Sequence, residues 1–341
     1  MRIIVDGMGG DHAPKEIVKG CVEAVLEYGI NITLTGDSQR LEQELRSLNA
    51  PMEHFEIIHT SQIITMEDSP VNAIRRKTDS SMVVGMELVK KDPDSVLISA
   101  GSTGALLAGG LLKVGRIKGI DRPALTSVLP NKKNGTLLLD MGANTECKPV
   151  NLAQFAMMGT VCMENVLGRK NPTVGLLNIG TEETKGNELY KSAYMLLKDM
   201  KGINFAGNIE ARDVPEGAVD IIVCDGFTGN IVLKYTEGLA LSLLGMLKET
   251  MMETTLSKLG AMLLKPSLRK FKKLMDYSEV GGAPLLGVNG GIIKAHGSSN
   301  TTAIKNAIRQ GKLYLESKVL DQIKNALAAE SAEPAESASE D

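Results

Sequence analysis

The segment RIIVDGMGGDHAPKEIVKGCVEAVLE, residues 2–27, decides the fold class. It begins with a short apolar run, passes through a glycine-rich turn and ends in apolar residues at helical spacing. Pro14 stands where the helix would begin, which is a favoured place for proline. A strand, a turn and a helix in this order form the repeating unit of proteins built on a parallel sheet.

The same unit recurs along the chain. The predicted strands are residues 3–5, 32–35, 55–58, 96–99, 124–129, 136–139, 174–177, 203–205 and 221–224. Several of these runs are apolar throughout, as expected of strands that are covered on both faces. The alternation with helical patterns predicts an α/β fold with a mostly parallel sheet and helices on both sides.

The overall composition excludes several classes of protein. The 341 residues are 43% hydrophobic, so the chain can bury a large core, and 38 basic against 41 acidic residues argue against nucleic-acid binding. The scattered cysteines offer neither a zinc cluster nor a CxxC pair, and they fit reduced thiols in a cytosolic protein. We see no signal segment before the first strand, and no apolar run approaches the ~20 residues that span a bilayer. These features predict a cytoplasmic protein that needs neither a metal nor a cofactor.

Two segments depart from the strand–helix rhythm. We expect residues 1–327 to form one large catalytic domain, from which a helical segment, residues 228–276, projects. This segment is rich in Leu and Met, and Gly260 and Pro266 are the expected breaks in it. Residues 328–341 are Ala, Ser, Glu and Pro with an acidic end, and they predict a disordered tail.

The turns that follow the strands share one chemistry. Glycine lets the backbone approach a ligand closely, and the amides that open a following helix favour an anion. Taken singly, each turn is better interpreted as a cap or a tight bend, but this interpretation weakens when all of them are considered together. The candidate residues for phosphate or substrate are Asp6, Gly7, Gly9, Gly10, Gly101, Ser102, Thr103, Gly104, Asp140, Gly142, Asn144, Lys185, Asn187, Asp225, Gly229, Asn230, Asn289, Lys294, His296 and Ser298. Because ligands bind beyond the carboxyl ends of parallel strands, we expect these turns to converge on one edge of the sheet as a cradle for an anion.

Other chemistries find weaker support. Gly7 and Gly9 begin a dinucleotide-like pattern, but His12 stands at the position of the third glycine, so a nicotinamide-dependent dehydrogenase is an alternative on a weak motif. Neither a phosphate-binding P-loop motif nor a GxSxG nucleophile motif occurs. Cys147 beside Lys148 could be a nucleophile, although an inert thiol is the favoured interpretation.

Six ordered motifs carry a resemblance to a known family. They are VDGMGGDHAP, SAGSTGALLA, LLDMGANTECKP, NIGTEETKGNELYK, CDGFTGNIVLK and GGAPLLGVNGGIIKAHGSSN, and they extend from Val5 to Asn300. Together they resemble the bacterial phosphate acyltransferase (PlsX) family. The resemblance implies a three-layer α/β/α fold similar to phosphotransacetylases and isocitrate dehydrogenases, a homodimer, and an early role in phospholipid synthesis at the inner face of the membrane.

The implied reaction transfers a fatty acyl group from the thioester of acyl-carrier protein to inorganic phosphate. Phosphate is the nucleophile, so the enzyme needs only to position the reactants and stabilise an oxyanion. On residue type and motif position, Lys185 and His296 are the leading charged candidates, and Asn230 and Asn187 are neutral donors. We expect Asp6, Asp140 and Asp225 to orient these groups.

The Leu- and Met-rich helical segment needs a covering surface, because a helix that is apolar all round is not stable in water. One interpretation is a helix pair that forms a bundle across a dimer axis. The other is an apolar tip, residues Leu259, Met262, Leu263 and Leu264, that enters an anionic membrane surface. The basic residues Arg269, Lys270, Lys272 and Lys273 would then contact lipid headgroups or dock the acidic carrier protein. A non-catalytic membrane scaffold is a further alternative.

Overall fold

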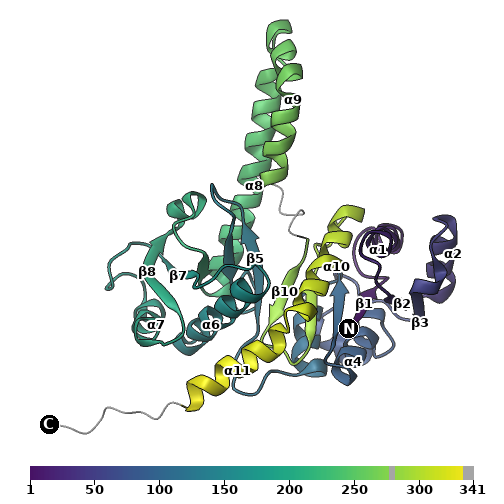
Figure 1. The fold of residues 1–341 in the computed structure, drawn as a ribbon, viewed down its shortest axis with the longest axis horizontal. Coiled ribbons are helices and arrows are strands. Elements are labelled where there is room, and N and C mark those ends of the chain that lie inside the picture. The colour runs from purple at the N-terminus through teal and green to yellow at the C-terminus, as the bar shows by residue number, and fades with distance from the viewer. Residues whose placement is uncertain (276–280, 333–341) are drawn as a thin grey trace.

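The computed structural model describes residues 1–275 and 281–332 (Figure 1). The strands are β1 (Arg2–Asp6), β2 (Ile32–Gly36), β3 (Phe55–His59), β4 (Ser95–Ser99), β5 (Ala124–Leu129), β6 (Thr136–Leu139), β7 (Thr173–Asn178), β8 (Asn204–Glu210), β9 (Ile221–Val223), β10 (Ala283–Leu286) and β11 (Gly291–Lys294). The helices are α1 (Lys15–Tyr28), α2 (Ser38–Ser47), α3 (Pro70–Arg76), α4 (Ser81–Lys91), α5 (Thr103–Gly109), α6 (Pro149–Asn165), α7 (Glu188–Asp199), α8 (Gly226–Met251), α9 (Thr255–Met275), α10 (Thr301–Glu316) and α11 (Val319–Ala332). Short helical turns occupy Met52–His54, Gly110–Val114 and Ala211–Glu216.

All these strands belong to one sheet, in the order β3-β2-β1-β4-β11-β10-β5-β6-β9-β7-β8. The block from β3 to β11 is parallel, and so is the block from β6 to β8. Between them, β10 is antiparallel to both β11 and β5, and β5 is antiparallel to β6. The prediction of a mostly parallel α/β sheet is confirmed.

The direction of the two blocks corrects one expectation. Three successive antiparallel pairings reverse the strand direction, so β6, β9, β7 and β8 run opposite to β1, β4 and β11. The carboxyl ends of the two blocks therefore point to opposite edges of the sheet. The expectation that all the glycine-rich turns meet at one edge is wrong for this reason.

Helices cover both faces of the sheet, which gives the three layers. Ile3 and Val5 of β1 pack in the core under α1 and α10, whereas Ile4 between them packs in the core under α4. Leu137 and Leu139 of β6 face α6, and Leu138 faces the other side with residues of α8. Alternate side chains of a strand point to opposite faces of the sheet. Because helices cover both faces, all the side chains of these apolar runs are buried.

Two elements at the C-terminal side were not predicted as strands. β10 and β11 are short and flank the turn at Gly287, and both lie in the middle of the sheet. α11 also differs from expectation, since it continues to Ala332 and so extends past the predicted start of the tail at Ala328. Residues 333–341 of the predicted tail lie outside the described residues.

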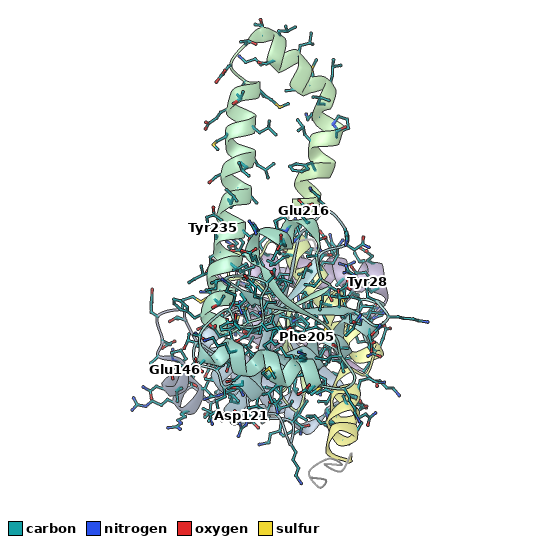
Figure 2. All side chains as sticks on the ribbon, turned by 90° about the vertical axis from the view of Figure 1, so that its left-hand side faces the viewer. Tyr28, Asp121, Glu146, Phe205, Glu216 and Tyr235 are labelled. Atoms are coloured by element: carbon teal, nitrogen blue, oxygen red, sulfur yellow. The ribbon has the colours of Figure 1, made fainter. Side chains whose placement is uncertain are left out.

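The projecting segment is an antiparallel helical hairpin of α8 and α9, which stands away from the body of the molecule (Figure 1). The chain reverses at Met252–Thr254 rather than at Gly260 or Pro266, both of which lie inside α9. The predicted positions of the breaks are therefore wrong. Figure 2 shows side chains standing out along the hairpin above Tyr235, which is 69% exposed.

Candidate functional site

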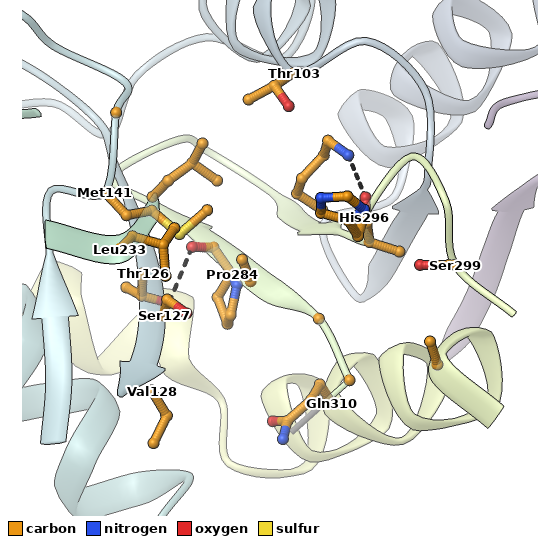
Figure 3. Close-up of a pocket in the computed structure, with 18 of the residues that line it drawn as sticks. Thr103, Thr126, Ser127, Val128, Met141, Leu233, Pro284, His296, Ser299 and Gln310 are labelled. Carbon is orange, nitrogen blue, oxygen red and sulfur yellow. Dashed lines mark hydrogen bonds between the residues drawn. The ribbon is translucent and has the colours of Figure 1, made fainter. Parts of the chain in front are cut away.

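A cavity of about 830 Å³ lies at the seam between the two blocks of the sheet. β10 pairs with β5 only at Ala124 and Leu125, so the continuing part of β5 diverges from it, and Thr126, Ser127 and Val128 line the cavity. Figure 3 shows Val128 and Gln310 at one end, Thr103 at the other and His296 on one wall. Its volume is in the range typical of small-molecule sites, about 300–1,000 Å³.

Seven of the predicted residues line this cavity together. They are Thr103, Gly104, Gly142, Asn230, Lys294, His296 and Ser298. They come from the start of α5, the loop after β6, the first turns of α8 and the end of β11. Residues far apart in the chain therefore meet in one cavity, although they arrive from both blocks of the sheet rather than from one edge.

Lys294 places a positive charge in the wall of the cavity. It is 6% exposed at the end of β11, and its ammonium donates to the carbonyl oxygen of Ala295. Burial lowers the pKa of Lys294 to about 8, although Asp11 and Asp6 oppose this shift. The lowered pKa means that the surrounding protein groups do not fully offset the loss of hydration of the buried ammonium. A group with such a perturbed pKa is typical of a functional site.

His296 follows Lys294 on the same wall. Its Nδ1 lies 2.9 Å from Ser298 Oγ and 3.3 Å from the Ser298 backbone nitrogen, whose N–H donates to it. Because Nδ1 accepts, the neutral ring carries its proton on Nε2. Desolvation lowers the pKa of His296, and the charges of Lys234 and Lys294 lower it further. The ring is therefore a neutral donor near pH 7.

Ser299 adds a polar group without a protein partner. Ser299 is 5% exposed, it lines the cavity, and its hydroxyl has no hydrogen-bond partner among the described residues. A buried hydroxyl without a partner costs free energy, so a ligand oxygen would relieve the cost. The neighbouring start of α10 is already occupied, because Glu16 accepts from the backbone N–H and the hydroxyl of Thr301.

Three charged residues of the cavity were missed at the sequence level. Asp11, Lys234 and Glu237 all line it, and Lys234 Nζ lies 3.0 Å from Glu237 Oε2. Lys234 and Glu237 follow Asn230 by one and two helical turns on α8, so their helical spacing was a usable signal. Asp11 lies in the loop after β1, where its backbone N–H donates to the Gly297 carbonyl oxygen at 2.8 Å.

The loop after β1 has a structural role. The Asp6 carboxylate accepts from the Ser99 hydroxyl at 2.7 Å and from the Met8 backbone N–H at 3.2 Å, and burial raises its pKa. A Cβ on Gly9 would lie 2.4 Å from Asp6 Oδ2 and 2.9 Å from the Gly101 backbone nitrogen. Gly10 adopts φ +104° against Ala100. These contacts, together with the Gly7 N–H bond to the Thr35 carbonyl oxygen, pack the loop against its neighbours.

A second pair of loops is held by carboxylates. Asp140 is fully buried and accepts from the backbone N–H groups of Leu125 and Ala143 and from both nitrogens of Asn144. Burial raises the pKa of Asp140. Asp225 caps α8 by accepting from the Thr228 N–H at 2.9 Å. These residues organise the backbone that presents Gly142 and Asn230 to the cavity.

Further predicted residues serve as caps or close contacts. Ser102 caps α5 by accepting from the Ala105 backbone N–H at 3.4 Å. Gly101 donates its N–H to Ser99 Oγ at 3.1 Å. A Cβ on Gly229 would lie 1.9 Å from the Asp140 carbonyl oxygen, so glycine is required where α8 passes this loop. None of these three residues lines the cavity.

The structure does not bring Lys185, Asn187 or Asn289 to this cavity, contrary to expectation. Lys185 follows β7 in the reversed block, and its Nζ lies 3.7 Å from Glu182. Asn187 caps α7 by accepting from the Tyr190 N–H. Asn289 lies in the β10–β11 turn, at the end of β11 opposite to Lys294, because the hairpin reverses the chain there.

Cys147 has the chemistry of an inert thiol. It is partly buried in the loop before α6, and its Sγ donates to the Asn144 carbonyl oxygen at 3.6 Å. Burial raises the pKa of its thiol to about 11, and Asp140 adds to the shift. A thiol with this pKa is almost entirely protonated near pH 7, so Cys147 is a poor nucleophile.

Comparisons with known proteins agree with the sequence motifs. The sequence model of a family described as "Fatty acid synthesis protein" matches residues 1–322. A phosphate acyltransferase of Alkaliphilus oremlandii is 56% identical over 96% of this chain and 98% of its own length. A phosphate acyltransferase of Clostridioides difficile is 56% identical over 95% of each chain.

A solved structure shares the fold. It is a phosphotransacetylase from Streptococcus pyogenes, with a TM-score of 0.60 at 18% identity, over 96% of this chain and 94% of that one. The predicted likeness to the phosphotransacetylase fold is confirmed. Because the family match covers nearly the whole chain and the relatives are more than half identical to it, this protein belongs to the family of fatty acid synthesis proteins that includes the phosphate acyltransferases.

Proposed function

We propose that this protein transfers a fatty acyl group from the thioester of acyl-carrier protein to inorganic phosphate, which yields acyl phosphate and the free carrier thiol. The observation that carries the proposal is the meeting of Lys294, His296, Ser299 and Asn230 in one cavity. The names of the relatives support acyl transfer to phosphate, and family membership supports a place in lipid synthesis. The dehydrogenase and scaffold alternatives are not favoured by these comparisons.

The reaction needs no covalent intermediate with the protein. A phosphate oxygen attacks the thioester carbonyl carbon, and the carbonyl oxygen becomes an oxyanion in the tetrahedral intermediate. The intermediate then expels the carrier sulfur as the C–S bond breaks, and the thiolate takes a proton from solvent or a nearby donor. The protein accelerates these steps by positioning the two reactants and by stabilising the negative charge.

We assign phosphate to the side of the cavity that carries Lys294 and Ser299. The ammonium supplies charge, and the partnerless hydroxyl supplies a hydrogen bond in a place where water is largely excluded. Ser298 and the Thr103–Gly104 turn adjoin the same space. Charged hydrogen bonds of this kind are about twice as strong as neutral ones.

We assign the developing oxyanion to the neutral donors His296 and Asn230. The neutral ring of His296 carries its proton on Nε2, because Nδ1 accepts from the Ser298 backbone N–H. Asn230 is an exposed residue of α8 that lines the same cavity. Lys185 and Asn187 remain predictions from the sequence, and we give them no chemical step, since neither lines the cavity.

The direct test is formation of acyl phosphate by the purified protein from palmitoyl-carrier protein and phosphate, without metal or nucleotide. His296→Ala should lower kcat by roughly 10²–10³, as loss of one oxyanion donor does. Lys185→Ala is the matched comparison, and it should retain much more activity. A folded His296→Ala protein with near-normal production would remove His296 from this role.

We further propose that the α8–α9 hairpin pairs with a second copy of the chain and contacts an anionic membrane. Leu259, Met262, Leu263 and Leu264 are 49–75% exposed on α9, and Leu241, Leu243 and Met246 are similarly exposed on α8. Exposed apolar patches of this kind mark protein or membrane contacts. None of the described helices is long and apolar enough to cross a membrane.

On this proposal the protein works in the cytoplasm at the inner face of the cell membrane. The basic residues Arg269, Lys270, Lys272 and Lys273 would add affinity for anionic lipid or for the carrier protein. Their side chains lie outside the described residues, so the hairpin's apolar positions carry the proposal alone.

A further inference from the structure

The cavity has two chemically different ends. The polar residues Lys294, His296, Ser298 and Asn230 gather at one part of it. The other part extends along β5 and is walled mainly by apolar side chains. Val128 of β5 pairs with Leu137 of β6. Cys162, Val166 and Leu167 come from the end of α6 and the residues after it, and Pro284 lies on β10. We call this second part, defined by these six residues, the apolar arm. In Figure 3 it lies toward Val128, away from His296 and Thr103.

Of the polar residues beside the apolar arm, Thr126 and Gln310 are engaged within the protein, and Ser127 offers a single hydroxyl. The Thr126 hydroxyl donates to the Pro284 carbonyl oxygen at 3.3 Å. Gln310 is buried and makes an interaction within the protein. A ligand segment with several amides would lose its hydrogen bonds to water there and would find few partners in return. A hydrocarbon chain has no such bonds to lose, and its burial away from water is favourable.

We propose that the apolar arm holds the hydrocarbon tail of the acyl group and that Val128 and Val166 help to set the chain length the enzyme accepts. The inference rests on the proposed function, because the thioester must then lie beside Lys294 and His296. The carrier's pantetheine arm, which is polar, leaves through the opposite part of the cavity. Val128 is half-buried on β5, and Val166 ends α6, so the two walls belong to different elements.

A chain-length series tests the apolar arm. In Val128→Phe the larger ring occupies the arm, and phenylalanine remains a good strand former. We expect kcat/KM for palmitoyl-carrier protein to fall about tenfold or more, since loss of a well-buried apolar contact of ~1.4 kcal/mol has that effect. Octanoyl-carrier protein should keep most of its wild-type value. Val150→Phe is the matched control, because Val150 is 43% exposed on α6 and does not line the cavity.

The outcomes separate this inference from the proposed function. If wild-type protein makes no acyl phosphate from either donor, the proposed function fails. If wild type is active and Val128→Phe lowers both donors equally, a group common to both fills the arm, such as pantetheine, and the inference is overturned. A folded Val128→Phe protein with unchanged palmitoyl activity also overturns it. Should Val128→Phe not unfold cooperatively on heating, Val166→Phe replaces it with the same expected and contrary results.

Discussion

Lys294 shows how a single residue can be costly to the fold and useful to the site. Its ammonium is buried at the end of a central strand, and burial lowers its pKa to about 8. The folded-state pKa lies below the usual value, so the charged form is penalised by folding. That penalty is fully present below pH 8 and is relieved as the pH rises toward 10.5, where the unfolded chain also loses its proton.

Replacing Lys294 should therefore separate stability from activity. We expect Lys294→Met to raise the free energy of unfolding at pH 7, by at most on the order of 3 kcal/mol, and to raise KM for phosphate strongly. Thermal unfolding and phosphate saturation curves measure the two effects. Lys305→Met is the control. Lys305 Nζ lies 2.8 Å from the Glu27 carboxylate, so its charge is already paired and its removal should not raise the free energy of unfolding. A less stable Lys294→Met protein with normal phosphate saturation would contradict the assignment.

The pH profile carries a second prediction about the same ammonium. If its charge holds phosphate, kcat/KM for phosphate should fall as the pH rises through about 8, where the ammonium loses its proton. The fall in kcat/KM should fit the loss of a single proton, and it should be absent in Lys294→Met. A flat profile from pH 7 to 9.5 would show that this charge does not contribute to phosphate binding.

At the residue scale, the sequence located part of the site. The motifs placed Lys294, His296 and Asn230 correctly near strand ends, and all three line the cavity. Lys294 ends β11, His296 lies in the loop after it, and Asn230 lies in the first turns of α8. Lys234 and Ser299 were missed because charge or a hydroxyl alone does not reveal burial. Lys185 and Asn289 were misplaced because motif membership does not tell which edge of the sheet a turn occupies.

At the element scale, α8 contains two glycines with opposite requirements. A Cβ on Gly229 would lie 1.9 Å from the Asp140 carbonyl oxygen, whereas a Cβ on Gly245 would meet no atom of the described residues within 4 Å. Both lie in the same helix, so their intrinsic helical preferences are alike. The difference between them reports the packing of the first turns of α8 against the loop after β6.

Alanine substitutions should move stability in opposite directions at these two positions. Gly229→Ala should lower the free energy of unfolding by about 1–3 kcal/mol or more, because backbone must shift. Gly245→Ala should raise it by up to about 1 kcal/mol, since alanine favours the helix. Urea unfolding measures both. Equal effects would mean that α8 does not pass Asp140 as closely as described.

The hairpin gives a separate prediction. Leu263→Glu should release the protein from anionic liposomes and spare activity on soluble substrate, because a carboxylate opposes both apolar insertion and anionic lipid. Ser242→Glu is the control, as it adds the same charge at an exposed polar position of α8. Flotation and sedimentation velocity are the readouts. Unchanged liposome binding would eliminate the membrane contact at Leu263, and a change confined to sedimentation would assign it to chain pairing.

Some strands and helices were predicted closely and others were missed, and the difference has physical reasons. Long apolar runs such as 96–99 and 221–224 coincide closely with β4 and β9. β10 and β11 were missed because closely spaced glycines flank both runs and favour a turn interpretation. Pro266 was expected to break the helix, but α9 includes it, and the chain instead turns at Met252–Thr254 where no glycine or proline stands.

At the scale of the whole molecule, ligand binding should stabilise the fold selectively. A ligand at 100 times its Kd adds about 2.7 kcal/mol to the free energy of unfolding. We expect phosphate and acyl-carrier protein to raise Tm, and NAD and NADP to leave it unchanged. A clear rise with either nucleotide would revive the dehydrogenase alternative.

For the molecule as a whole, the sequence predicts the fold class but not the direction of every strand. The strand–helix alternation correctly indicates an α/β fold with a mostly parallel sheet. The reversal of the second block could not be predicted, because it depends on β10, a short strand that is inserted between β11 and β5. Strand direction is set by these non-local pairings, and local sequence pattern carries no record of them.

The position of β10 and β11 has a consequence for biosynthesis. These strands are the last to leave the ribosome, yet they occupy the centre of the sheet between β4 and β5. Until residues 283–294 are made, β4 and β5 each present a bare edge, and such edges readily pair with other chains. The nascent protein must therefore wait for its final portion before either half closes, and a transcript cut short before that point would yield an aggregation-prone product.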